Sequence, residues 1–333
     1  MSNIALAHEA EAALRLHGIT KRFGPTLAVD EFDLAVPRGA LYGFIGPNGA
    51  GKTTTLRMIM SILFPDSGRM QVLGEESSLA AKDRIGYLPE ERGVYRKMRV
   101  GELLAYIARL KGIDARGLDK RARSALARVG LEATERKRCE ELSKGMLQKL
   151  QFMAAIIHEP ELLILDEPFS GLDPVSMRQL KDLLLEEHRR GATVLFSTHV
   201  MPQAEEICRH IVMIHRGRKV LDDDLDEIRR RYEPRSLHFD PLDPQADLGT
   251  LAALAEVERI EAAERGYTIA LTEGAEPGEA IRRIVSAIAP ASIEIARPRL
   301  EDIFIELVSG SEAADAEKKL RAPEEAIEAE GLI

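Results

Sequence analysis

The chain of 333 residues contains no tryptophan and only two cysteines, Cys139 and Cys208, which lie far apart in the sequence. Two distant cysteines provide neither the several disulfides of a small secreted domain nor the paired spacing of a zinc site. We therefore expect both to be packing residues in a protein of a reducing compartment such as the cytosol.

Long apolar runs are also missing, because no stretch approaches the roughly 18 uninterrupted apolar residues of a membrane-spanning helix. The first 13 residues carry two glutamates and no basic residue, which is not the pattern of a secretory signal peptide. Apolar residues make up 45% of the chain and charged residues 30%, values typical of soluble globular proteins. This composition excludes a largely disordered, collagen-like or mucin-like chain.

The net charge of −9 is unevenly distributed along the chain. Residues 13–232 include 36 basic and 31 acidic residues, whereas residues 233–308 include 7 basic and 15 acidic ones. The change of sign coincides with a proline-containing stretch at 232–236, which predicts a domain boundary there. We therefore expect two domains, 13–232 and 233–308, between an N-terminal tail of residues 1–12 and an acidic, flexible tail of residues 309–333.

Buried strands alternate with helices in the first domain, which is typical of an α/β fold with a mainly parallel sheet. The predicted strands cover 40–45, 161–166 and 192–197, and the predicted helices cover 52–63, 175–190 and 201–208. Residues 98–158 contain no convincing strand, so we expect a helical insertion into the sheet lobe.

The second domain has a different order of elements. The predicted strands cover 236–239, 256–262, 266–272 and 291–297, and the predicted helices cover 245–254, 277–289 and 300–308. In chain order, the six elements before the helix at 300–308 follow the succession β-α-β-β-α-β. This succession predicts a small α+β domain of the ferredoxin-like kind.

A glycine-rich motif, Gly46-Pro-Asn-Gly-Ala-Gly-Lys-Thr53, follows a predicted strand and opens a predicted helix. This context distinguishes a phosphate-binding loop from a chance glycine-rich turn. Glycines allow backbone N–H groups to surround phosphates, and the helix N-terminus adds positive potential. The residues expected to bind the nucleotide here are Gly46, Pro47, Asn48, Gly49, Ala50, Gly51, Lys52, Thr53 and Thr54. Lys52 is expected to reach the β- and γ-phosphates and to assist catalysis, and the Thr53 hydroxyl to bind Mg²⁺.

Two acidic residues follow the apolar strand that ends in Leu165. Asp166 is expected to hold Mg²⁺, through water, and Glu167 to act as general base toward the attacking water. His199 follows another buried strand, at the edge of the sheet where ligands of α/β proteins collect.

These motifs, together with Leu142-Ser-Lys-Gly-Met146 at the start of a helix, resemble those of ATP-binding cassette (ABC) transporter ATPase subunits over about residues 13–232. The resemblance implies a P-loop NTPase cassette that binds ATP and Mg²⁺. It places Phe23 on the adenine and assigns His199 as the switch histidine beside the γ-phosphate. It also assigns Asp173 to the loop after the acidic pair, and Ser143, Lys144, Gly145 and Met146 to the family signature.

The resemblance also implies partners. In this family two cassettes close head to tail, and each ATP lies between the phosphate loop of one and the signature of the other. A second ATPase subunit, either another copy or a paralogue, and a separate transmembrane permease are therefore expected. Such a subunit would lie in the cytoplasm, peripherally on the inner face of the cell membrane.

Two departures from the family pattern stand out. Glu90, in Ile85-Gly-Tyr-Leu-Pro-Glu90, occupies the position of a usual glutamine, and we expect it to bind Mg²⁺ more tightly than an amide would. The alternative is that Glu91 or a shifted loop takes this role. In the signature, Lys144 replaces a glycine and Met146 a glutamine, so Lys144 either adds positive charge near the partner's phosphates or is simply solvated.

These departures and the appended acidic domain resemble ATPases of bacterial ABC-2-type exporters, including the sodium-export and drug-resistance kinds. The segment from Leu300 to Val308 is similar to one that often ends proteins of that group. A role of the second domain in stabilising a dimer or in regulation is a hypothesis.

The leading expectation is thus an ATPase that powers export through a separate permease, and the alternative is a soluble cassette ATPase of nucleic-acid repair or translation. Only one cassette is present, and no sustained heptads separate its motifs, which disfavours the alternative. No N-K-x-D motif supports a GTP switch, and intact Lys52, Asp166, Glu167 and His199 disfavour a pure scaffold. The basic helical insertion could contact nucleic acid, an anionic membrane surface or only solvent, and its lack of interleaved aromatics disfavours nucleic acid.

Overall fold

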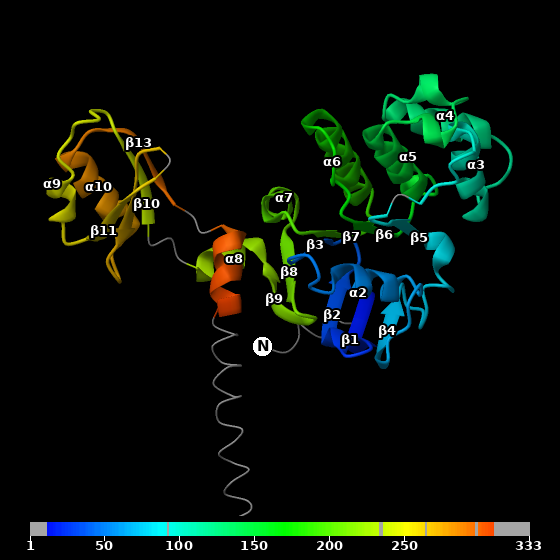
Figure 1. The fold of residues 1–333 in the computed structure, drawn as a ribbon, viewed down its shortest axis with the longest axis horizontal. Coiled ribbons are helices and arrows are strands. Elements are labelled where there is room, and N and C mark those ends of the chain that lie inside the picture. The colour runs from blue at the N-terminus through cyan, green and yellow to red at the C-terminus, as the bar shows by residue number, and fades with distance from the viewer. Residues whose placement is uncertain (1–11, 92, 233–235, 264, 297–298, 310–333) are drawn as a thin grey trace, which may run out of the picture. The chain divides into compact units, whose positions relative to one another are not determined.

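The computed structural model describes residues 12–91, 93–232, 236–263, 265–296 and 299–309, so most of the two predicted tails lies outside the described residues (Figure 1). Its contacts divide the chain into two compact units between Leu225 and Asp226, a few residues before the boundary expected from charge. Helix α8, Leu225–Arg231, accounts for the difference. Its last turn is basic like the first unit, yet its residues from Asp226 onward fall in the second unit.

A six-stranded sheet forms the centre of the first unit, with the order β5-β6-β7-β3-β8-β9 (Figure 1). Its strands are β3 (Leu41–Ile45), β5 (Ile85–Leu88), β6 (Leu162–Asp166), β7 (Thr193–Thr198), β8 (His210–His215) and β9 (Arg218–Asp224). All neighbours pair in parallel except β8 and β9. Every residue of β3, β6 and β7 is buried, which explains why these strands are mainly apolar, with polar side chains only at the ends of β6 and β7. The predicted parallel sheet is confirmed.

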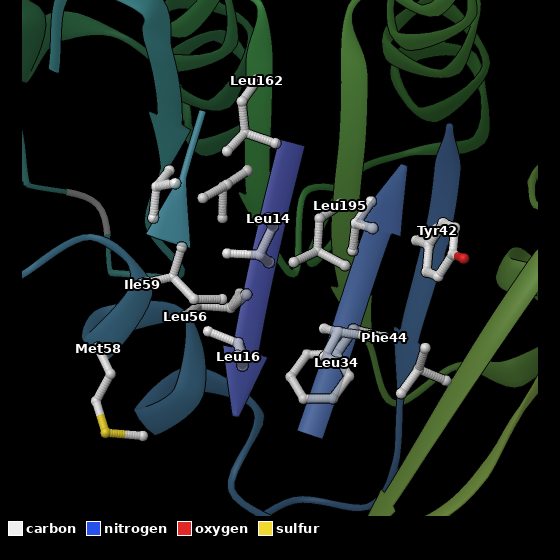
Figure 2. Packing of buried hydrophobic residues seen from close by; sticks show 14 of the residues in the cluster. Leu14, Leu16, Leu34, Tyr42, Phe44, Leu56, Met58, Ile59, Leu162 and Leu195 are labelled. Atoms are coloured by element: carbon white, nitrogen blue, oxygen red, sulfur yellow. The ribbon is translucent and has the colours of Figure 1, made fainter. Parts of the chain in front are cut away.

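A second, antiparallel sheet of the first unit has the order β2-β1-β4 and was not expected from the sequence. It contains β1 (Ala12–Phe23), β2 (Thr26–Pro37) and β4 (Ser67–Val72). Several register shifts between β1 and β2 interrupt the polar–apolar alternation that announces such strands. Figure 2 shows its leucines packed toward Phe44 and Leu195 of the parallel sheet, so the two sheets share one core.

Helices of the first unit fall into two groups. Helices α2 (Lys52–Ile59), α6 (Pro174–Arg189) and α7 (Met201–Ile207) follow strands β3, β6 and β7, as expected. Helices α3 (Val100–Leu110), α4 (Leu118–Arg128) and α5 (Lys144–Ile156) form the helical insertion predicted at 98–158. None of the helices in the described part of the chain is long and apolar enough to cross a bilayer.

The second unit contains a four-stranded antiparallel sheet of order β11-β12-β10-β13. Its elements are β10 (Ser236–Pro241), α9 (Gly249–Ala252), β11 (Val257–Ala262), β12 (Tyr267–Leu271), α10 (Pro277–Ala287) and β13 (Pro290–Ile295), followed by a helix over 300–309. Numbered from the first strand of the unit this order is 2-3-1-4, and with the β-α-β-β-α-β succession it confirms the ferredoxin-like expectation. Helix α9 is shorter than predicted, because Asp243 and Asp247 accept local backbone hydrogen bonds that form turns before it.

Candidate functional site

Strands β3, β6 and β7 lie side by side in the parallel sheet, and they end at one edge of it (Figure 1). The register aligns Ile45 with Thr198 and Asp166 with Ser197. The phosphate loop after β3, the acidic pair at the end of β6 and His199 after β7 therefore share this edge. Long-range strand pairing, rather than sequence proximity, assembles the site.

Two glycines of the loop are required by close backbone approach. A Cβ at Gly46 would lie 2.2 Å from the Ile214 carbonyl oxygen, and one at Gly51 would lie 2.5 Å from the Ala28 carbonyl oxygen. Gly51 also has φ +112°, a conformation that other residues rarely adopt. Neighbouring β2 and β8 thus hold the loop close against the sheet.

Lys52, the first residue of α2, is 6% exposed. Its Nζ donates to the carbonyl oxygens of Gly46 at 2.7 Å and Pro47 at 3.2 Å, and lies 3.7 Å from Glu167 Oε1. Burial lowers the pKa of Lys52, while the charges of Glu167, Asp166 and Glu90 act in the opposite direction. The lysine therefore links the loop to the acidic residues across the site.

Asp166 is fully buried, and only one of its two carboxylate oxygens accepts hydrogen bonds. Its Oδ1 accepts hydrogen bonds from Ser197 Oγ at 2.5 Å and Thr53 Oγ1 at 3.3 Å, whereas Oδ2 has no hydrogen-bond partner in the structure. Burial raises the pKa of Asp166, and the two hydroxyl hydrogen bonds lower it. A buried oxygen without a donor suits a hard cation, because Mg²⁺ prefers carboxylate and hydroxyl oxygens.

Glu167 is 7% exposed and lies against His199. Its Oε1 accepts a hydrogen bond from the His199 backbone N–H at 2.9 Å and lies 2.8 Å from His199 Nδ1. The backbone of Glu167 has φ +49°, which is uncommon for a residue with a side chain. Its N–H donates to the Ser197 carbonyl oxygen at 3.2 Å, which supports this conformation. A carboxylate held in this way is suited to accept a proton from water.

A cavity of about 210 Å³ lies over these groups. Its lining residues are Asn48, Gly49, Gly51, Lys52, Thr53, Thr54, Glu90 and Glu167. Glu90, two residues after β5, thus lines the same cavity, and its expected binding of Mg²⁺ stays a prediction. The cavity is smaller than the roughly 300–1,000 Å³ of a complete small-molecule pocket, so it suits the phosphate end of a nucleotide. Phe23 is not among the lining residues, and its ring is 47% exposed, with Lys21 Nζ 5.7 Å from the ring centre.

The signature segment does not line this cavity. Ser143 is the N-cap of α5, and its Oγ accepts a hydrogen bond from the Met146 N–H at 3.3 Å. Ser143 and Lys144 are exposed, and Gly145 and Met146 are half-buried. The N-terminus of α5 therefore presents the signature at the surface, while its predicted contact with ATP stays a prediction.

Asp173 has a structural task of its own, because it caps the N-terminus of α6. Its Oδ1 accepts from the N–H groups of Val175 and Ser176, and its Oδ2 accepts from Ser176 Oγ at 2.6 Å. These hydrogen bonds, with that of the Ser176 hydroxyl the strongest, lower the pKa of Asp173. Its assigned contact with the nucleotide stays a prediction beside this capping role.

Two residues of the site were not anticipated. Ser197 hydrogen-bonds both the Asp166 side chain and the backbone of Glu167. The sequence feature that could have indicated it is its position two residues before His199. Gln148, 3% exposed, donates from Nε2 to the Pro168 carbonyl oxygen at 3.0 Å. This hydrogen bond links α5, which carries the signature, to the residue after Glu167. The sequence feature that could have indicated Gln148 is a polar residue on a buried helix face.

Comparison with known proteins agrees with this geometry. Residues 29–170 match the family model described as ABC transporter, and residues 224–308 match that of the C-terminal domain of DrrA1-3-like ATP-binding proteins. The chain therefore belongs to the ATP-binding proteins of ABC transporters, and it is an ATPase subunit that binds ATP and powers transport.

Particular relatives extend over most of the chain. The uncharacterized ABC transporter ATP-binding protein YhaQ of Bacillus subtilis is 38% identical over 295 residues, which cover 89% of this chain and 98% of YhaQ. The daunorubicin resistance ATP-binding protein DrrA3 of Streptomyces coeruleorubidus is 32% identical over 309 residues, covering 90% and 96%. A solved structure of an ATP-binding subunit of an ABC transporter superposes with a TM-score of 0.61 at 30% identity, covering 66% of this chain and 93% of that one.

Proposed function

We propose that this subunit hydrolyses Mg²⁺-bound ATP at an interface with a second ATPase subunit and thereby drives export through a separate permease. The observation that carries the proposal is the convergence of Lys52, Asp166, Glu167 and His199 at one sheet edge, next to the phosphate loop. A cation, a metal-binding carboxylate and a general base are the parts that phosphoryl transfer to water requires.

Each side chain has a role in this proposal. Lys52 turns from the loop carbonyls to the β- and γ-phosphates, and the loop N–H groups surround the phosphate oxygens. Glu167 accepts the proton of the attacking water. His199, which holds Glu167 Oε1 from two nitrogens, orients that carboxylate and contacts the γ-phosphate.

The residues around Asp166 fit a magnesium ion. The described residues contain no group of three or more histidines, cysteines or acids that could enclose a metal by themselves. Mg²⁺ is usually held by one or two carboxylates together with phosphates and water, so such a group is not needed. Thr53, Asp166 through its free Oδ2, and Glu90 would hold the ion, which supplies neutralisation of charge on the phosphates.

A second ATPase subunit is part of this proposal, because the signature segment of one copy does not line the phosphate cavity of the same copy. The exposed N-terminus of α5 offers the Ser143 hydroxyl, the adjacent N–H groups and the Lys144 charge to an anion. We place it against the γ-phosphate bound by a second subunit, either another copy or a paralogue. We place the permease near residues 90–105, from the loop after β5 into α3, and this contact keeps the subunit on the cytoplasmic face of the membrane. The C-terminal domain shared with DrrA proteins, one of them named for daunorubicin resistance, supports export.

The substitution Glu167→Gln tests the catalytic assignment. The amide keeps the shape of the side chain but cannot accept a proton, so we expect turnover to fall by at least about 100-fold while ATP binding persists. Size-exclusion chromatography with ATP and Mg²⁺ should then show a trapped dimer. The matched control is Glu186→Gln on the surface of α6, which should hydrolyse ATP normally. Turnover of Glu167→Gln at the native rate would overturn the assignment of the base.

A further inference from the structure

The helical insertion brings together two basic segments that lie far apart in the sequence, 96–99 (Arg-Lys-Met-Arg) and 136–138 (Arg-Lys-Arg). Backbone hydrogen bonds join them, from the Cys139 N–H to the Met98 carbonyl oxygen at 3.0 Å and from the Val100 N–H to the Lys137 carbonyl oxygen at 2.9 Å. The two backbones run side by side, and six cationic side chains are exposed on them: Arg96, Lys97, Arg99, Arg136, Lys137 and Arg138.

Most of this charge has no ion-pair partner in the part of the chain that the structure describes. Arg99 lies 4.0 Å from Glu102, and Arg138 lies 3.6 Å from Glu140, in exposed pairs of little strength. The structure gives the other four cations, Arg96, Lys97, Arg136 and Lys137, no acidic partner among the residues that it describes. An anion can therefore approach four cations without first displacing an ion pair.

Exposed aromatic and apolar side chains adjoin these cations. On α3, Tyr106, Arg109 and Leu110 occupy one face at helical spacing, with Tyr106 38% and Leu110 56% exposed. The ring of Tyr95, 57% exposed, meets that of Tyr106 edge to face at 5.6 Å. A hollow of about 380 Å³ is lined by Tyr106 together with Arg99, Arg109, Arg123 and Arg136. We call this surface, from both basic segments to Tyr95, Tyr106 and Leu110, the basic–aromatic face.

We propose that the basic–aromatic face binds the anionic surface of a phospholipid bilayer. Clustered lysines and arginines are attracted to anionic headgroups, and tyrosines favour the headgroup level, where the ring is apolar and the hydroxyl is hydrated. Leu110 adds an apolar side chain that can enter between headgroups. The contact rests on the proposed function in that a transporter subunit works at a membrane. Residues 95–99 also fall within the segment 90–105 that we assign to the permease, so we place the lipid contact on a subunit that is not bound to its permease. This contact needs neither ATP nor the permease.

Single-stranded nucleic acid suits this face less well. Bases stack on open aromatic rings, whereas Tyr95 and Tyr106 present their rings to each other. Glu102, Asp119 and Glu135 also line the hollow, and they would repel a chain of phosphates that tracks through it.

Sedimentation of the full-length protein with vesicles tests the proposal. Vesicles of phosphatidylglycerol mixed with phosphatidylcholine should bind the protein, and vesicles of phosphatidylcholine alone should not. Removing two cations that each contribute about fivefold, in Arg136→Glu with Lys137→Glu, should weaken binding by roughly 30-fold or more. The double variant Tyr106→Ser with Leu110→Ser should also weaken binding, because the apolar contacts are lost.

The matched control is Arg69→Glu with Arg209→Glu, which makes the same change of charge at two exposed arginines outside the face. It should bind vesicles like the native protein, and circular dichroism and ATP binding should show that all variants are folded. Equal binding to both kinds of vesicle, or equal loss in the control, would overturn the proposal. So would unchanged vesicle binding of Arg136→Glu/Lys137→Glu together with loss of binding to single-stranded DNA or to the permease. Loss of ATPase activity alone would bear on the proposed function instead.

Discussion

Asp166 shows how single residues divide the work of the site. Its Oδ1 is occupied by the hydroxyls of Ser197 and Thr53, and its Oδ2 is left without a donor. The Ser197 hydroxyl thereby decides which oxygen is left free for the proposed metal ion, and Ser197 itself is fully buried in β7. Ser197 is for this reason a positioning residue rather than a catalytic one.

Removing this hydroxyl in Ser197→Ala should therefore change the dependence on Mg²⁺ more than the affinity for ATP without metal. We expect the Mg²⁺ concentration for half-maximal activity to rise about 10-fold or more, because losing the partner that orients a metal ligand weakens metal binding by roughly 10- to 100-fold. Mg²⁺-dependent thermal stabilisation of the ATP complex provides a measurement independent of turnover. Ser197→Thr, which keeps a hydroxyl, should have nearly the native dependence on Mg²⁺. An unchanged Mg²⁺ profile in Ser197→Ala would contradict the positioning role of Ser197.

At the scale of elements, the helical insertion is anchored on β5, the strand that leads to Glu90. The Ile85 carbonyl oxygen accepts hydrogen bonds from Lys111 Nζ at 2.7 Å and from His158 Nε2 at 3.0 Å. Lys111 ends α3 and His158 follows α5, so both helices are tied to one carbonyl group. A movement of the insertion would therefore displace the Ile85 carbonyl group and with it β5.

His158 makes this anchor sensitive to acid. Burial, with the nearby charge of Lys111, lowers its pKa from 6.5 to about 4. Between these values the unfolded chain binds a proton that the folded chain does not, so stability is full above pH 6.5 and falls as the pH drops toward 4. The loss from this group should reach at most about 3 kcal/mol. Urea unfolding of His158→Gln should show a shallower decline across this range, and an equal decline would refute the assignment.

The whole molecule consists of two units with separate hydrophobic cores. The second unit has its own cluster, which includes Leu237, Phe239, Ile269 and Ile284, all at most 1% exposed. The large core of the first unit draws on the parallel and antiparallel sheets together. The residues of each cluster belong to a single unit, as expected of domains that can fold independently.

Separate expression of the two units tests this independence. A fragment of residues 1–225 should bind ATP as the full chain does, and a fragment of residues 226–333 should unfold cooperatively, because each keeps its core intact. Isothermal calorimetry and thermal circular dichroism are the measurements. A C-terminal fragment without a cooperative transition would show that its core is insufficient by itself.

Much of the architecture could be predicted because strong local patterns encode it. The central residues of β3, β6 and β7 are apolar, because both faces of a parallel sheet are covered. The antiparallel β1 and β2 escaped prediction because register shifts break their alternation. Helix α9 is shorter than the periodicity predicts, because the side chains of Asp243 and Asp247 form turns over the residues before it.

By itself, the sequence determined the phosphate loop, the acidic pair, His199 and the central apolar strands, because each depends on neighbours within a few residues. Only the tertiary structure decided which oxygen of Asp166 is free, that Ser197 controls it, and that Gly51 faces the Ala28 carbonyl oxygen. It alone joined the basic segments 96–99 and 136–138. These features depend on strand register and on backbone contacts between distant segments, and no local pattern of residues specifies either.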